Sequence, residues 1–220
     1  MKLPICDISP FTLQDFPDHT ACILWFGGCN MRCSYCHNPE LVLGKKQRLP
    51  WKEVHQFLKE RQNLLDGVVL SGGECTLSPE LPDFIRQLRK VGYKIKLDTN
   101  GLRPDVLDIL LSKNQLDYVA LDYKAPQNKF QKITGKPQYY TFKRSLDMLC
   151  KRDVPFEVRT TVHTALLDEQ DIATIMNDLQ KNGFTGDYFI QNFQDSPETI
   201  EPMQKSSHQL DISSLPRTKT

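Results

Sequence analysis

Short apolar segments alternate along the chain with longer segments in which apolar residues recur at helical spacing. The short segments predict strands at residues 21–26, 67–70, 93–99, 117–123, 156–163 and 187–191. The longer segments predict helices at residues 50–65, 78–91, 104–111, 140–151 and 168–182. Strands and helices that alternate in this way indicate a parallel sheet with crossover helices.

The middle strands carry charged residues at every second position, which decides between two kinds of parallel sheet. An open doubly wound sheet has helices on both faces, so its strands are continuous apolar runs. Here Lys96 and Asp98 alternate with Ile95 and Leu97, and the strand at 156–163 alternates in the same way. Buried charges are costly unless they are paired, so this face predicts an interior that holds a polar ligand. We therefore predict an α/β fold, a partial (β/α)6 TIM-like barrel of parallel strands with outer helices.

Length and composition restrict the function further. The chain has 220 residues, which suits one domain and falls short of the ~250 residues of a complete barrel. Lys and Arg number 28 against 27 Asp and Glu, and this balance argues against a nucleic-acid partner. No apolar run reaches the ~20 residues of a membrane span, so we expect no membrane partner. The sequence predicts a domain at 1–194 and a flexible polar tail at 195–220.

Seven cysteines, an odd number without a secretion signal, predict reduced thiols and a cytoplasmic location. Cys29, Cys33 and Cys36 form a Cys-x3-Cys-x2-Cys motif directly after the first predicted strand. Three interpretations are open: a structural zinc site that adds His37, three unrelated core thiols, or a [4Fe-4S] cluster with one iron free of protein ligands. Adjacent ligands at 36 and 37 suit a tetrahedral ion poorly, and the loop is polar, so the motif favours the cluster.

This motif, with the aromatic Tyr35 before its last cysteine, resembles the signature of the radical S-adenosylmethionine (SAM) superfamily. The loop at 71–74, Ser-Gly-Gly-Glu, resembles the second motif of that superfamily. The segments at 97–101 and 122–124 resemble further motifs of the activases of glycyl-radical enzymes. Within that group the chain is most similar to activating proteins of anaerobic ribonucleoside-triphosphate reductase, although pyruvate formate-lyase activases share most of these motifs.

The resemblance implies a definite chemistry. Cys29, Cys33 and Cys36 would hold a [4Fe-4S] cluster whose open iron binds SAM, with no catalytic residue beyond the cluster. The reduced cluster would cleave SAM, and the resulting radical would abstract hydrogen from a glycine of a partner enzyme. The implied partners are a glycyl-radical enzyme and a low-potential electron donor such as flavodoxin or ferredoxin. The residues implied in SAM binding are Tyr35, Cys36, His37, Gly72, Gly73, Glu74, Asp98, Asn100, Asp122 and Lys124.

The sequence leaves alternatives to this function open. The chain could be a pyruvate formate-lyase-type activase, a radical SAM enzyme for a small molecule, or a zinc-stabilised binding module. Asp98, Asp122 and Lys124 could instead form internal ion pairs, the last two with each other or with Arg159. Cys75 stands where the family usually has proline. The last predicted strand lacks the histidine of the pyruvate formate-lyase activases, which favours the ribonucleotide reductase subgroup.

Overall fold

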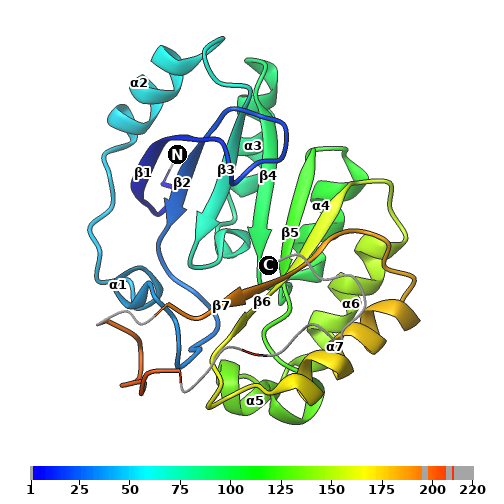
Figure 1. Ribbon diagram of the computed structural model, residues 1–220. Coiled ribbons are helices and arrows are strands. Elements are labelled where there is room, and N and C mark those ends of the chain that lie inside the picture. The colour runs from blue at the N-terminus through cyan, green and yellow to red at the C-terminus, as the bar shows by residue number, and fades with distance from the viewer. Residues whose placement is uncertain (1, 195–197, 207–209, 211–220) are drawn as a thin grey trace.

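A computed structural model describes residues 2–194, 198–206 and 210, and its centre is a curved sheet of seven strands (Figure 1). The strands lie side by side in chain order, and β2 to β7 are parallel while β1 is antiparallel to β2. Within the described residues β1 and β7 are the two edges, so the sheet is an open, partial barrel. The strands are β1 Ile5–Thr12, β2 Ala21–Phe26, β3 Gly67–Gly72, β4 Lys94–Thr99, β5 Tyr118–Asp122, β6 Phe156–Val162 and β7 Tyr188–Asn192.

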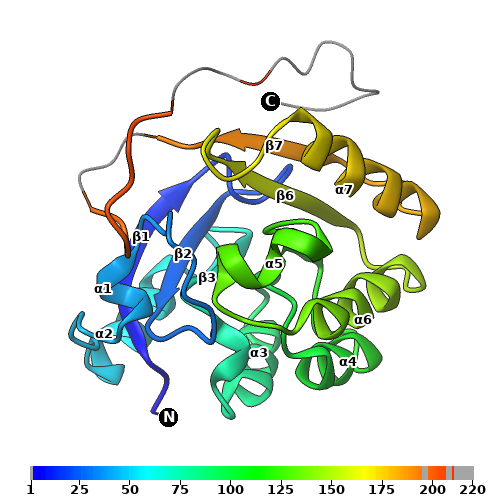
Figure 2. The ribbon, with the colours of Figure 1, turned by 90° about the horizontal axis from the view of Figure 1, so that it is seen from below.

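Helices cover the outer, convex side of this sheet, and two shorter ones lie at the end toward which the parallel strands point (Figure 2). The covering helices are α2 Trp51–Arg61, α3 Leu81–Lys90, α4 Pro104–Ser112, α6 Tyr139–Cys150 and α7 Glu169–Lys181. The helices at the carboxyl end are α1 Pro39–Val42 and α5 Gln127–Thr134. In the described part of the chain, no helix has the length and apolar character to cross a membrane.

The outer face of the sheet forms the main core. Ile95, Leu97, Val119 and Leu121 are fully buried there, against apolar side chains of the covering helices. The predicted alternation is confirmed, because the charged residues between these positions lie on the inner face and bond to one another. Burial of apolar surface on one face therefore stabilises the fold and leaves the other face available for polar groups.

A second, smaller apolar cluster closes the inner face near the amino ends of the strands. Phe16, in the loop between β1 and β2, packs there with Ala21, Ile23 and Val69. A side chain at Gly67 would lie 2.7 Å from the Phe16 ring, so this position requires glycine. The inner face is thus apolar at one end and charged toward the carboxyl ends of the strands.

Several elements differ from the sequence-based expectation. The sheet has seven strands rather than six, because the amino-terminal segment adds β1 as an antiparallel edge. Helices α1 and α5 and a 3₁₀ turn at Cys75–Leu77 also lie in segments for which the sequence predicts no helix. The predicted tail falls partly outside the described residues. In its described part, the Glu201 N–H donates to the Ser34 carbonyl at 3.1 Å, and the Gln204 carbonyl lies 2.7 Å from Nε2 of His163.

Candidate active site

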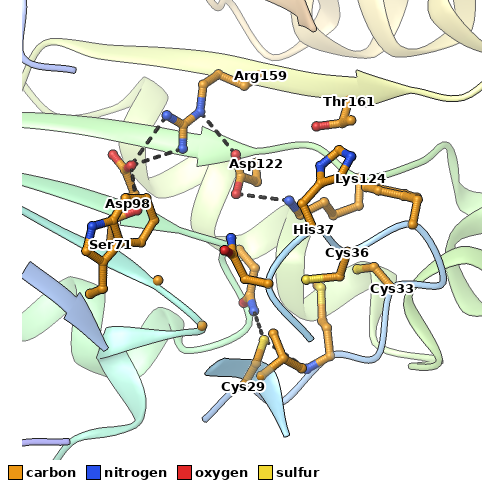
Figure 3. Close-up of a pocket in the computed structure, with 18 of the residues that line it drawn as sticks. Cys29, Cys33, Cys36, His37, Ser71, Asp98, Asp122, Lys124, Arg159 and Thr161 are labelled. Atoms are coloured by element: carbon orange, nitrogen blue, oxygen red, sulfur yellow. Dashed lines mark hydrogen bonds and ion pairs between the residues drawn. The ribbon is translucent and has the colours of Figure 1, made fainter. Parts of the chain in front are cut away.

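The three clustered cysteines lie on one loop that follows β2 and face a cavity at the carboxyl end of the sheet (Figure 3). Gly28 opens this loop with φ +88°, a left-handed conformation that favours glycine. The loop is fixed at both sides, because Gly28 N–H donates to Leu41 O at 2.7 Å and Arg32 N–H donates to Thr134 O at 2.8 Å. Helices α1 and α5, which the sequence pattern did not predict, therefore position the thiols.

Two glycines at the end of β3 form the neighbouring wall of the cavity. Gly72 has φ +114°, and a side chain there would lie 2.5 Å from the Phe26 backbone. A side chain at Gly73 would lie 2.0 Å from the Gly28 carbonyl oxygen. The Gly73 N–H donates to Phe26 O at 2.8 Å and the Glu74 N–H donates to Gly28 O at 2.9 Å. Gly73 is thus required for contact between its own loop and the thiol loop, a role that the sequence did not indicate.

Glu74 lies behind this wall and does not line the cavity, in contrast to the SAM contact that the resemblance implies. Its carboxylate accepts hydrogen bonds from Thr99 Oγ1 at 3.0 Å and from Asn100 N–H at 2.7 Å. It also accepts two bonds from Thr76, and its burial raises its pKa. Glu74 therefore ties the end of β4 to the glycine loop and holds Asn100 toward the cavity.

Asn100 connects this wall to the thiols. Its side-chain amide donates to Asn30 Oδ1 at 2.8 Å and lies 3.6 Å from Cys29 Sγ. Its own Oδ1 accepts the Leu102 N–H at 3.0 Å, which fixes the orientation of the amide. A donor held against a thiolate sulfur stabilises the anionic form that a metal ligand requires.

Arg159 of β6 is the centre of the charged inner face (Figure 3). Its guanidinium lies 3.1 Å from Asp122 Oδ1 and 3.3 Å from Asp98 Oδ2. Lys124 Nζ donates to the other Asp122 oxygen at 3.0 Å. The sheet register produces this arrangement, because Asp122 and Arg159 are directly paired across β5 and β6. The internal pairing that the sequence left open as an alternative for Asp122 and Lys124 is present in the structure.

The electrostatics of Asp122 and Lys124 follow from this pairing. Burial alone would raise the pKa of Asp122, but Lys124 and Arg159 outweigh it and hold the pKa below its ordinary value. Burial would lower the pKa of Lys124, but Asp122 outweighs it, and the pKa lies above its ordinary value. Both groups are therefore charged at neutral pH in a site that is largely removed from solvent.

Two polar atoms at the cavity are buried and have no hydrogen-bond partner among the described residues: Asp98 Oδ1 and the Tyr35 hydroxyl. The other Asp98 oxygen accepts from Ser71 Oγ at 2.9 Å, and Oδ1 lies 3.7 Å from Lys96 Nζ, so the carboxylate is held in a fixed orientation. A buried polar atom without a partner costs about 1–3 kcal/mol. An acceptor of this kind in a cavity suits a ligand that carries hydroxyl groups.

The thiols themselves suit iron–sulfur chemistry. Burial raises the pKa of Cys29 to about 11 and that of Cys33 to about 12, so metal binding must displace their protons. In the residues that the structure covers, no group of three or more His, Cys, Asp or Glu side chains converges on one ion. Three sulfur donors around a shared space instead match a cluster, in which each thiolate binds a different iron.

His37 lines the cavity next to Cys36, but other contacts fix its ring. The ring stacks on Phe193 with centroids 4.5 Å apart, and its Nε2 lies 2.8 Å from the Gln194 carbonyl. Phe193 also packs edge-on against His163, whose ring centroid is 4.8 Å away. His163 is buried and does not line the cavity, whereas Gln191 at the end of β7 does.

Most of the residues chosen from the sequence thus come together around one cavity of about 350 Å³. The expected residues that line it are Cys29, Cys33, Tyr35, Cys36, His37, Gly72, Gly73, Asp98, Asn100, Asp122 and Lys124. Cys75 does not line it, and its buried sulfur lies 3.6 Å from the Asp98 carbonyl. The cavity is also lined by residues that the sequence did not predict: Asp15, Ile23, Trp25, Met31, Asn38, Val42, Ser71, Arg159, Thr161 and Gln191. Arg159 and Thr161 stand at the polar positions of the alternating sequence of β6, and this alternation could have identified them as residues of the inner face.

Sequence comparisons relate this chain to known proteins. The family model of the radical SAM superfamily matches residues 23–180. A Methanocaldococcus jannaschii protein, named provisionally as a glycyl-radical enzyme activating enzyme, is 29% identical over 211 residues, covering 93% of this chain and 86% of its own. The pyruvate formate-lyase 1-activating enzyme of Escherichia coli is 34% identical over 161 residues, covering 69% of this chain. This chain spans 64% of that enzyme and 50% of the pyruvate formate-lyase-activating enzyme of Clostridium pasteurianum.

Solved structures share the fold. Native anSMEcpe with bound AdoMet gives a TM-score of 0.63 at 19% identity, covering 77% of this chain and 50% of that one. Streptococcus suis SuiB bound to the precursor peptide SuiA gives a TM-score of 0.64 at 13% identity, covering 79% of this chain and 39% of that one. At these identities the likeness shows the fold alone, and the neighbours are partial barrels like this one.

Proposed function

Because this chain belongs to the radical SAM superfamily, whose cofactors are a [4Fe-4S] cluster and SAM, we propose that it activates a glycyl-radical enzyme. The observation that carries the proposal is the set of three thiols that faces a glycine-walled, charged cavity. The relatives that bear the names of activating enzymes support the same function.

Cys29, Cys33 and Cys36 would hold the cluster, each through one thiolate. Three thiolates leave one iron of a [4Fe-4S] cluster without a protein ligand, and the amino and carboxylate groups of SAM would take that place. When bound there, the cluster would supply the electron for reductive cleavage of SAM, the chemistry by which a hydrogen atom would be removed from the partner's glycine. Asn100 would hold the Cys29 side of this site through its amide.

The remaining residues of the cavity would bind and orient SAM. The backbone at Gly72 and Gly73 is free of side chains and can approach the methionyl end. Asp98 Oδ1 offers an acceptor for ribose hydroxyls. Lys124 and Arg159 hold the pKa of Asp122 below its ordinary value, and the ionised carboxylate would favour the positively charged sulfonium nearby.

A protein substrate fits the cavity better than a small molecule. The open side of the sheet, between the unpaired edges β1 and β7, leaves room for an extended loop.

We further propose anaerobic ribonucleoside-triphosphate reductase as the partner. Support comes from Gln191, which lines the cavity on β7 in a region where pyruvate formate-lyase activases carry a histidine. A pyruvate formate-lyase is the second candidate, because relatives with 34% identity are named as activating enzymes of pyruvate formate-lyase.

The test is anaerobic incubation of the reconstituted protein with SAM, a reductant and each candidate partner. Electron paramagnetic resonance should show a carbon-centred doublet on one partner and none when the partner's glycine is changed to alanine. The partner that gives the doublet decides between the two candidates. SAM cleavage coupled to a free metabolite, without a radical on either protein, would contradict the proposal.

A further inference from the structure

The outer side of the thiol loop carries positive charge. Arg32, between Cys29 and Cys33, is exposed to solvent and does not line the cavity. Its guanidinium donates hydrogen bonds to Cys29 O and Met31 O, both at 2.7 Å. The charge of Arg32 is therefore held directly against the backbone that carries the thiols.

The carboxyl-terminal end of α5 extends this positive surface. The Arg32 N–H donates to Thr134 O at 2.8 Å, and a side chain at Gly135 would lie 3.4 Å from Arg32 Cβ. Lys132 lies in the last turn of α5 and is exposed, and Lys136 follows the helix and is half-buried. We call Arg32, Lys132 and Lys136 the basic patch.

The basic patch carries no acidic residue within its own two segments, and Glu201 lies beside the thiol loop, where its N–H donates to Ser34 O. The segments 27–38 and 126–138, which form this surface, contain no Asp or Glu. Within the described residues, no member of the patch takes part in an ion pair, whereas the neighbouring Lys129 pairs with Asp171 and Asp168. The whole chain has a net charge of only +1, whereas the patch carries three positive charges beside the thiol loop.

We infer that the basic patch is the docking surface for an acidic one-electron carrier protein, an inference that rests on the proposed function. One electron would pass from the reduced carrier to the oxidised cluster, so that the carrier is oxidised and the cluster reduced by one electron, and no atom is transferred. Electron transfer weakens steeply with distance, and the patch covers the outside of the loop that would hold the cluster. Opposite charges speed encounter and orient the two proteins.

Docking at the basic patch also leaves the cavity free. The members of the patch lie outside the set of residues that line it. An electron carrier on the outer side of the loop and a glycine-bearing partner at the cavity could therefore bind this chain at different surfaces.

The test compares two double variants with the same change in net charge. K132E/K136E reverses two charges of the patch and leaves Arg32, which supports the loop, in place. K59E/K113E is the control, because Lys59 is likewise in the last turn of a helix and Lys113 likewise follows one. Both control residues precede strands and so lie at the opposite end of the sheet from the thiol loop.

Anaerobic biolayer interferometry would measure the affinity for a reduced flavodoxin of known negative charge, and stopped-flow spectroscopy would measure cluster reduction. At low ionic strength K132E/K136E should weaken flavodoxin binding and slow reduction by about tenfold, and high salt should remove the difference. K59E/K113E should resemble the wild type, and dithionite should reduce all three proteins equally fast.

Equal losses in both variants, or no loss in K132E/K136E, would overturn the inference. So would weaker binding of the glycyl-radical enzyme to K132E/K136E with unchanged flavodoxin binding, because the patch would then serve the other partner. Failure of the proposed function is distinguishable: the wild type would then lack a cluster that dithionite reduces, or would not cleave SAM with it.

Discussion

The two faces of strands β4, β5 and β6 are both buried, yet their chemistry is opposite. On the outer face Ile95, Leu97 and Leu121 are fully buried among apolar side chains. On the inner face the Lys96 side chain is only 2% exposed, but it lies 3.2 Å from Glu157 and 3.7 Å from Asp98. The outer face gains stability from the removal of apolar surface from water.

The inner face gains little stability from its charges. Replacing a buried ion pair by apolar residues of similar volume is often neutral or stabilising. A fold selected for stability alone would therefore not need Arg159 and its carboxylate partners at this position. The difference between the faces indicates that the inner face is arranged for a ligand, and Asp98 Oδ1, which has no hydrogen-bond partner among the described residues, agrees with this interpretation.

The largest expected effect comes from Arg159→Leu on the inner face. This change removes the guanidinium from Asp98, Asp122 and Glu157 and leaves buried carboxylates without full compensation. We expect a loss of about 3–5 kcal/mol in the free energy of unfolding, measured by urea denaturation of the reduced protein. Arg152→Leu is the control, because Arg152 and Asp108 form a half-exposed pair that is worth at most about 1 kcal/mol. Similar losses in both variants would show that Arg159 contributes no more to stability through its buried ion pairs than Arg152 does through its half-exposed pair with Asp108.

On the outer face, Leu121→Ala should cost about 2–5 kcal/mol, because it leaves a cavity in the packed core. The folded fraction should keep its iron content and its affinity for SAM. Urea denaturation and calorimetric titration with SAM would measure the two effects separately. A large loss of SAM affinity with a small loss of stability would contradict the separation of the two faces.

Asp98→Asn should weaken SAM binding with little effect on iron content. Ser71 and Arg159 donate to one Asp98 oxygen, so the amide oxygen of Asn would take that position and the NH₂ group would replace Oδ1, the acceptor without a hydrogen-bond partner. Loss of a hydrogen bond to a charged group costs about 1.5–3 kcal/mol, which raises Kd roughly tenfold to a hundredfold. Asp105→Asn, at an exposed pair with Arg103, is the matched control. An unchanged Kd in Asp98→Asn would refute the assignment.

Gly73→Ala should reduce both cluster content and SAM affinity. The added methyl group would lie 2.0 Å from the Gly28 carbonyl, and overpacking of this kind costs about 1–3 kcal/mol. Gly183→Ala is the control, since a side chain there meets nothing within 4 Å and only its φ of +72° is unfavourable. Iron analysis of both proteins after reconstitution would measure the difference. Full iron content in Gly73→Ala would show that the two loops can separate without loss of the cluster.

The sequence predicted the outer architecture well, because the alternation in β4 to β6 directly reflects the two faces. It did not reveal β1, whose segment contains Pro10 and polar residues that are typical of an edge strand. It also missed α5, a short and mostly polar helix that is held in place by its contact with the thiol loop. Isolated helices of this length are marginal, so tertiary contacts rather than local pattern determine it.

The candidate site was predicted to the extent that it depends on local motifs. The spacing of Cys29, Cys33 and Cys36 and the glycine pair at 72 and 73 lie within single loops. The network around Arg159 depends on register across β4, β5 and β6, which no single segment encodes. The placement of Glu74 behind the wall likewise results from hydrogen bonds to residues of a different strand.

The measurement that tests the central claim most directly is electron paramagnetic resonance of the dithionite-reduced protein with and without SAM, together with iron analysis. We predict about four irons per chain and a cluster signal that changes when SAM is added, because SAM binds at an iron that no thiolate of this chain occupies. The Asp98→Asn protein should need more SAM to give the same change. Zinc in place of iron, or a cluster signal that SAM leaves unchanged, would contradict the account.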